Sequence, residues 1–182
     1  MSNIKPSINL FGKEYYNDDQ ISELAYKQME KNGRWKIILT ENTLSGHTLH
    51  NNGNIIKLNF NGIYILLKKN GLAETSLYTG SSTKSSNDID NRIGKFIKHN
   101  RGIPITQNSG TQHRDDHAAA IWLRKNGICN VENDDVYVMW VSDDFIYNLG
   151  QNIILKKIEN KLIVKKRSIS NKENRKHWIS YA

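Results

Sequence analysis

The sequence of 182 residues predicts one mixed α/β (α+β) domain, in which helices flank a small central antiparallel sheet. Patterns typical of helices and of strands alternate along the chain, and an Asn70-Gly71 pair between two apolar runs is a hairpin signal. No internal repeat or low-complexity linker divides the chain. The length fits one domain with an elaboration.

The first 60 residues predict a helix and two strands. Residues 18–31 carry apolar side chains at helical spacing and end at the stop signal Asn32-Gly33. Residues 35–40 and 55–60 are rich in isoleucine and other apolar residues, which favours strands. Residues 41–54 are polar and predict a loop.

The chain after residue 60 predicts the order strand, strand, helix, helix, strand, helix. The first of these helices places Ile89, Ile93 and Phe96 on one face and has Ser86 or Asn87 as its cap. A polar loop is expected over 100–112. The elements are expected at 63–68, 76–79, 88–99, 115–125, 136–141 and 152–166, the last with Ile154, Leu155, Ile158 and Leu162 facing inward.

The charge is concentrated at the C-terminal end. The chain has 26 Lys and Arg against 18 Asp and Glu, a net charge of +8. Residues 151–182 hold nine basic and two acidic side chains, so this stretch contributes +7. Such a surface favours an anionic partner, either nucleic acid or an acidic membrane surface.

Several classes of protein are excluded or disfavoured by composition. Cys129 is the single cysteine, which excludes an internal disulfide and a cysteine metal cage. No apolar run approaches the roughly 20 residues of a membrane helix, and the N-terminus lacks a signal peptide, so we expect a cytoplasmic protein. His113 and His117 lie one turn apart, as zinc ligands can, but further ligands are missing and a helix face or basic patch is favoured.

Two tyrosines stand on the predicted hairpin. With a three-residue loop, Tyr64 faces Tyr78 across the ladder and both phenols project from one sheet face. A two-residue Asn-Gly turn shifts the register by one and separates them. Two phenols beside Gly80 would suit a phosphate-handling site, and ordinary strand tyrosines remain the alternative.

Two charged residues lie at the edges of apolar helix faces. Arg92 is suited to bidentate phosphate contact, or is a solvated helix charge. Glu159 is the one acid in a lysine-rich helix, and it could hold a divalent cation or serve as an ion-pair partner.

Taken in chain order, these residues resemble the GIY-YIG nuclease family. Gly62-Ile63-Tyr64 matches its first motif, and Tyr78-Thr79-Gly80 matches its second with Thr in place of Ile. Arg92 matches the family's helix arginine. The run 159–163 and Asn171 are similar to the nuclease domain of bacterial excision-repair incision subunits, with Ser168 in place of a proline. The resemblance covers residues 60–175 and implies a GIY-YIG-type sheet.

The resemblance implies metal-dependent hydrolysis of phosphodiester bonds in double-stranded DNA. Glu159 would ligate Mg²⁺ or Mn²⁺. Tyr64 would act as general base or position the attacking water, and Tyr78 would assist it or bind the phosphate. Arg92 would neutralise the transition state, and Asn171 would orient the phosphate.

The sequence also departs from the family. Phe96 stands where relatives often have Tyr or His, so Lys84 or His99 is expected to assist instead. Residues 100–135 resemble an insertion into a nuclease core that spans 61–182. The basic side chains expected to bind DNA are Lys156, Lys157, Lys165, Lys166, Arg167, Arg175 and Lys176.

The function expected is that of a sequence-specific endonuclease of type II restriction kind. Residues 1–60 would then form a DNA-recognition or dimerisation extension, and palindromic sites would imply a homodimer. The alternatives are a phage, mobile-element or branch-directed repair nuclease with the same chemistry, or a non-catalytic nucleic-acid-binding module.

Overall fold

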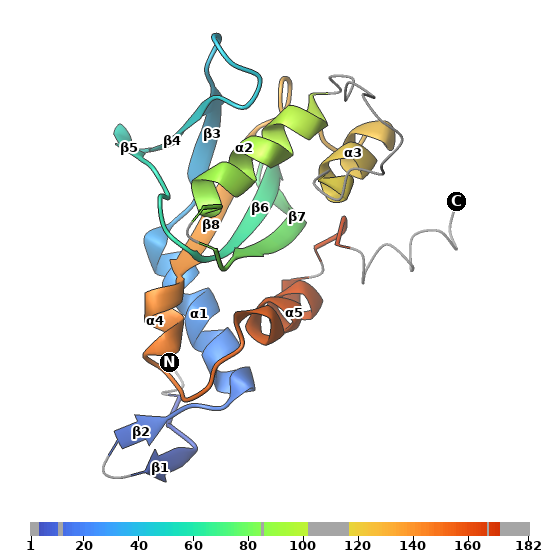
Figure 1. Cartoon of the computed structure of the whole chain (residues 1–182). Helices are drawn as coiled ribbons and strands as arrows, with labels where there is room; N and C mark the ends of the chain where they lie inside the picture. Colours follow the sequence, from blue (N-terminus) through green and yellow to red (C-terminus); the bar gives the residue numbers. More distant parts are fainter. Residues whose placement is uncertain (1–3, 11–12, 85, 102–116, 167, 172–182) are drawn as a thin grey trace, which may run out of the picture.

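The computed structural model describes the chain except for residues 1–3, 11–12, 85, 102–116, 167 and 172–182. Figure 1 shows a mixed fold in which helices surround a twisted sheet. The strands are β1 (Ile8–Leu10), β2 (Lys13–Tyr15), β3 (Trp35–Leu39), β4 (His47–Asn51), β5 (Asn54–Ile56), β6 (Gly62–Asn70), β7 (Ala73–Ser82) and β8 (Val136–Ser142). The helices are α1 (Asp18–Asn32), α2 (Ile89–Asn100), α3 (Ala118–Lys125), α4 (Asp143–Tyr147) and α5 (Leu155–Lys166).

The main sheet has six strands in the order β5-β4-β3-β8-β6-β7, and every neighbouring pair is antiparallel. The predicted fold class, a mixed domain around an antiparallel sheet, is confirmed. Strands from the first 60 residues and from the later part of the chain share this sheet, because β3 pairs with β8. Strands β1 and β2 form a separate hairpin that the sequence reading missed.

Successive residues of β6 point to opposite faces of the sheet and build two cores. On one face, Tyr64 and Leu66 pack with α2 and α3. On the other face, Ile63 and Ile65 pack with α1, α4 and α5. Because both faces are covered, β6 is buried from Gly62 to Leu67 and reads in the sequence as a continuous apolar run.

The prediction of a loop over 41–54 was wrong in its second half. Strand β4 occupies His47–Asn51, and only Leu49 in it is buried, so its polar side chains concealed it. The hairpin from β4 to β5 turns at Asn52 and Gly53, whose φ angles are 47° and 80°. An Asn-Gly pair with positive φ at both positions is typical of a tight hairpin, so the signal was present in the sequence.

The strand expected over 55–60 is also shorter than predicted. It ends at Ile56, and the residues after it carry the chain to β6. Conversely, the two strands of the predicted hairpin are longer than expected. Strand β6 extends by one residue at its start and by two at the turn, and β7 extends by three residues at each end.

The predicted helices are present with shifted ends. Asp88, not Ser86 or Asn87, caps α2, and its side chain accepts a hydrogen bond from the Asn91 N–H at 2.8 Å. Helix α5 begins at Leu155 rather than at residue 152, which leaves Ile154 54% exposed and not inward. The helix expected at 115–125 is described from Ala118, and the five-residue α4 was not predicted. Most of the loop expected over 100–112 lies outside the described residues.

Within the residues that the structure describes, no helix is both long enough and apolar enough to cross a membrane.

Candidate functional site

The register of β6 and β7 brings the two tyrosines to one sheet face. It does so with a two-residue loop and an irregularity in the strand pairing, a combination that the sequence did not predict. Asn70 pairs with Ala73, so the loop has two residues, Gly71 and Leu72. The register then shifts between Leu66 and Leu67 and skips a residue of β7. This irregularity restores the shared face, and the tyrosines lie diagonally, with Tyr64 opposite Gly80 and Tyr78 opposite Leu66. Their ring centroids are 6.1 Å apart.

Gly80 provides the space in which both rings lie. A Cβ atom at this position would come within 2.7 Å of the Tyr64 hydroxyl and within 2.7 Å of Tyr78 Cε1. The Tyr64 side chain therefore lies across the backbone of β7, the last strand of the sheet. Any larger residue would push the phenols apart.

Tyr64 is a buried, protonated phenol, with 1% of its surface exposed. Burial raises its pKa well above 10, and the nearby Tyr78 and Glu159 act in the same direction. The positive charge of Arg92 opposes the shift. Three of the other residues singled out in the sequence thus lie near enough to Tyr64 to act on it electrostatically.

Arg92 contributes an unused hydrogen-bond donor. Its Nε atom is buried and has no hydrogen-bond partner in the described part of the chain. A buried donor without a partner is costly, and groups of this kind are frequent where a ligand or water completes the bonding. The Nε–H of Arg92 is therefore free to donate a hydrogen bond to an anion.

Glu159 reaches the same strand from the opposite face of the sheet. It lies on α5, is 2% exposed, and accepts hydrogen bonds from the Ser81 hydroxyl and from Lys156 Nζ, the latter at 2.7 Å. Ser81 neighbours Gly80 on β7. The helix pattern placed Glu159 at the boundary of the apolar face, and the structure buries it beside Ile158 and Leu162.

Glu159 is a carboxylate bonded to β7 beside the second motif, and it can be compared with the needs of a cation that takes few protein ligands. No group of three or more His, Cys, Asp or Glu side chains that could hold a metal occurs among the described residues. Mg²⁺ commonly uses one or two carboxylates and completes its shell with water and substrate phosphate. A carboxylate has about four lone-pair sites, and two donors leave room for such an ion. Glu159 is the residue that would hold it.

Asn171 is bound to the backbone of β7 instead of facing an open site. Its Oδ1 accepts from the Thr79 N–H and its Nδ2 donates to the Thr79 carbonyl, both at 2.8 Å. Ile169 and Ser170 donate their N–H groups to the carbonyls of Ser76 and Leu77. Asn171 therefore fixes the strand that carries the second motif, and this bonding uses its oxygen and one of its two N–H donors.

His117 is a site residue that the sequence reading missed. Its ring contacts Tyr78 and Phe96 edge-on, with centroid distances of 4.7 and 5.2 Å. Burial lowers the pKa of His117 to about 3, and the positive charges of His99, Arg92 and Lys95 act in the same direction. From the sequence, His117 and His113, which lies outside the described residues, were weighed as zinc ligands, and a helix face or basic patch was favoured. Its contact with Tyr78 depends on tertiary packing and leaves no local signal.

The two residues expected to replace Phe96 have different positions. His99 lies at the end of α2, and its Nδ1 accepts a hydrogen bond from the backbone N–H of His117 at 3.0 Å. It is therefore connected to Tyr78 through His117. Lys84 is exposed and lines a groove along the side of α2. Phe96 itself is buried in the core.

The basic side chains assigned to DNA binding are used in different ways. Lys157 and Lys165 are exposed on α5, and Lys156 pairs with Glu159. Lys166 lies 3.2 Å from the centre of the Tyr26 ring, which ties it to α1. Arg167, Arg175 and Lys176 lie outside the described residues.

Comparisons of the chain with protein-family models, with curated proteins and with solved structures give no match. The resemblance to the GIY-YIG family therefore rests on the motif residues and stays a prediction.

Proposed function

We propose that the protein is a divalent-metal-dependent DNA endonuclease of the GIY-YIG type. The observation that carries this proposal is the grouping of Tyr78, Arg92 and Glu159 around Tyr64. The two phenols share one face of β7, Glu159 bonds to Ser81 on its other face, and all three residues act electrostatically on Tyr64. The four residues come from two strands and two helices, and their grouping around one buried phenol is what a shared chemical task would require.

Each side chain suits a step of phosphodiester hydrolysis. Arg92 offers a desolvated N–H to the negative charge on the phosphoryl oxygens in the transition state. Tyr64 keeps its proton at neutral pH, so its O–H is suited to positioning the attacking water or a phosphate oxygen. Tyr78 lies beside Tyr64 and contacts the neutral imidazole of His117, which can hold its orientation. Glu159 would hold Mg²⁺ or Mn²⁺, which when bound would polarise the scissile phosphate.

The test is digestion of supercoiled plasmid with Mg²⁺ or Mn²⁺, followed by sequencing of the ends. We expect cleavage by the full chain and none in EDTA. Glu159→Gln and Arg92→Gln should each lower the rate by at least about 100-fold, the usual cost of losing a group that stabilises the transition state. Glu23→Gln, which alters an exposed carboxylate of α1, is the matched control and should cut at the wild-type rate.

Circular dichroism spectra of the variants must match the wild type, so that loss of cleavage is not loss of fold. Cleavage by Glu159→Gln within tenfold of the wild type would contradict the proposed role of the carboxylate. Ends at one sequence would indicate a restriction-type enzyme, which acts as a homodimer on palindromic sites. Scattered ends or cutting at branches would indicate a phage, mobile-element or repair nuclease.

A further inference from the structure

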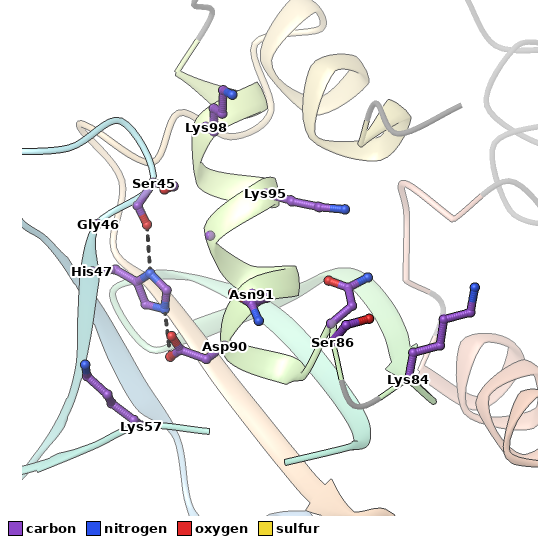
Figure 2. A pocket seen from close by; sticks show the side chains of 12 residues that line it. Ser45, Gly46, His47, Lys57, Lys84, Ser86, Asp90, Asn91, Lys95 and Lys98 are labelled. Carbon is purple, nitrogen blue, oxygen red and sulfur yellow. Dashed lines mark hydrogen bonds and ion pairs between the residues drawn. The ribbon is translucent and has the colours of Figure 1, made fainter. Parts of the chain in front are cut away.

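A groove of about 730 Å³ runs along the side of α2, outside the cluster of motif residues. Figure 2 shows that its side chains come from the start of β4, the chain after β5, the chain after β7, and the outer face of α2. The residues lining it are Ser45, Gly46, His47, Lys57, Lys84, Ser86, Asn87, Asp90, Asn91, Gly94, Lys95 and Lys98. None of these residues has a large apolar side chain.

The groove is strongly basic because its lysines are not neutralised. It holds four lysines, and none of them forms an ion pair with an acid in the described part of the chain. Some lysines elsewhere are paired, as Lys36 is with Asp135 at 2.9 Å and Lys68 with Asp134 at 3.2 Å. An unpaired cluster of this kind is an electrostatic site for an anion.

The acidic member of the lining, Asp90, is bound to His47. The Asp90 carboxylate lies 3.2 Å from His47 Nε2, and His47 Nδ1 lies 3.0 Å from the Ser45 carbonyl oxygen. Burial disfavours the imidazolium, but the hydrogen bonds to Asp90 and Ser45 outweigh it and raise the pKa of His47. Asp90 therefore has His47 as its hydrogen-bond partner and forms no ion pair with the groove lysines, although the charge of Lys57 also acts on it.

The end of α2 does not supply the anion site by itself. The N–H groups of Ile89 and Asp90 donate to the carbonyls of Phe60 and Leu58, and the next two N–H groups donate to Asp88. The first-turn donors are thus already used. Attraction for an anion in this groove comes from the lysine side chains.

The arrangement of the lysines favours an extended polyanion. Lys95 and Lys98 stand one turn apart on α2, and Lys57 and Lys84 lie on opposite sides of the Asp90 end of that helix in Figure 2. The charges do not converge on a single point, as they would around a free phosphate. A membrane surface would need apolar side chains among the basic ones, and this lining has none.

Lys95 connects the groove with the candidate site. It lines the groove, and its charge also lowers the pKa of His117, which contacts Tyr78. Lys95 also follows Arg92 by three residues on α2, so the two side chains lie on adjacent turns of the helix. A DNA strand lying in the groove would therefore pass close to Arg92.

We propose that this groove binds the sugar–phosphate backbone of double-stranded DNA and leads it to the candidate site. The inference rests on the proposed function for its choice of ligand. Its own evidence is the lysines that line the groove without an acidic partner among the described residues, and the position of Lys95 one turn from Arg92 on α2.

The test measures binding without cleavage. Anisotropy of a short labelled DNA duplex is followed in EDTA, over about 50 to 200 mM salt. The variant replaces Lys57, Lys95 and Lys98 with Gln, and leaves Lys84 because it is a candidate assisting residue. The control replaces the exposed Lys27, Lys31 and Lys125, which changes the net charge equally.

We expect the groove variant to lose at least about tenfold in affinity, and the slope of log K against log salt to fall by about 2.7, since each phosphate contact contributes about 0.9. The control should lose less than about a third of that slope. Melting temperatures of both variants should stay near that of the wild type, because all six side chains are at the surface.

Equal losses in the two variants, or an unchanged slope in the groove variant, would overturn the inference. So would groove-dependent binding to phosphatidylserine vesicles with unchanged binding to the duplex. If no metal supports plasmid cleavage but the groove variant still loses the duplex, the groove stands and the nuclease proposal fails. If the wild type cuts plasmid but the groove variant and the control bind the duplex alike, the nuclease proposal stands and the groove inference fails.

Discussion

At the scale of single residues, the missing side chain of Gly80 and the neutral ring of His117 define the candidate site. Gly80 lets Tyr64 cross β7, and His117 supports Tyr78 from the other side. The motif order was enough to select Tyr64, Tyr78, Arg92 and Glu159 from the sequence. It could not select His117, because the ring reaches Tyr78 from the start of α3 through packing between segments far apart in the chain.

The buried His117 should make the fold sensitive to acid. Its pKa is about 3 in the folded chain and about 6.5 when unfolded, so the unfolded state binds a proton below pH 6.5 that the folded state does not. Stability is therefore lost as the pH falls through this window. Denaturant unfolding should show the wild type losing about 2 kcal/mol more than His117→Asn between pH 7 and pH 5.

Asparagine is the suitable replacement because His117 caps α3 by accepting a hydrogen bond from the Ala120 N–H, and Asn can keep that bond. An identical pH dependence in the two proteins would show that the imidazole is not held neutral.

At the scale of elements, the site depends on how the segment 168–171 holds β7. Residues of this segment bond to the outer side of the strand, and Asn171 takes both backbone groups of Thr79, between Tyr78 and Gly80. The sequence indicated that Asn171 belongs to the site, but a motif gives the residue and not its bonding partner. In the same way, the apolar runs predicted β6 and β8, whereas the polar β4 and the short α4 carried too little periodicity.

Removing the Asn171 amide should loosen this strand. Asn171→Ala leaves the buried N–H and C=O of Thr79 without partners, at a cost of about 2 kcal/mol in the free energy of unfolding. Hydrogen exchange should become faster at the Thr79 amide than at amides in the middle of β6. Uniform acceleration across the sheet would mean that the amide acts only on global stability.

At the scale of the whole molecule, the first 60 residues are part of both cores. Met29 of α1 is buried against the face that holds Ile63, and Leu49 of β4 is buried on the face that holds Tyr64. The sequence placed a boundary near residue 60 because the motifs begin there. The position of a motif shows where the candidate functional residues begin and not where a folding unit begins. The pairing of β3 with β8 shows that one sheet contains strands from both sides of residue 60.

A fragment of residues 61–182 should therefore fail to fold by itself. Removal of residues 1–60 exposes the apolar surface that α1, β3 and β4 cover in the full chain. Circular dichroism and thermal melting should show no cooperative transition for the fragment and a clear one for the full chain. A cooperative transition in the fragment would establish residues 61–182 as an independent domain.

The cover over β7 also limits how two copies of this chain can associate. An open sheet edge can accept a strand from another molecule, which leads to aggregation or to a shared sheet. Here one edge is taken by Ile169 and Ser170, and the other is β5, which offers three residues. Among the described strands of the main sheet, little edge is left for a second copy, so we expect a dimer reading a palindrome to join through other surfaces and each candidate site to stay with its own sheet.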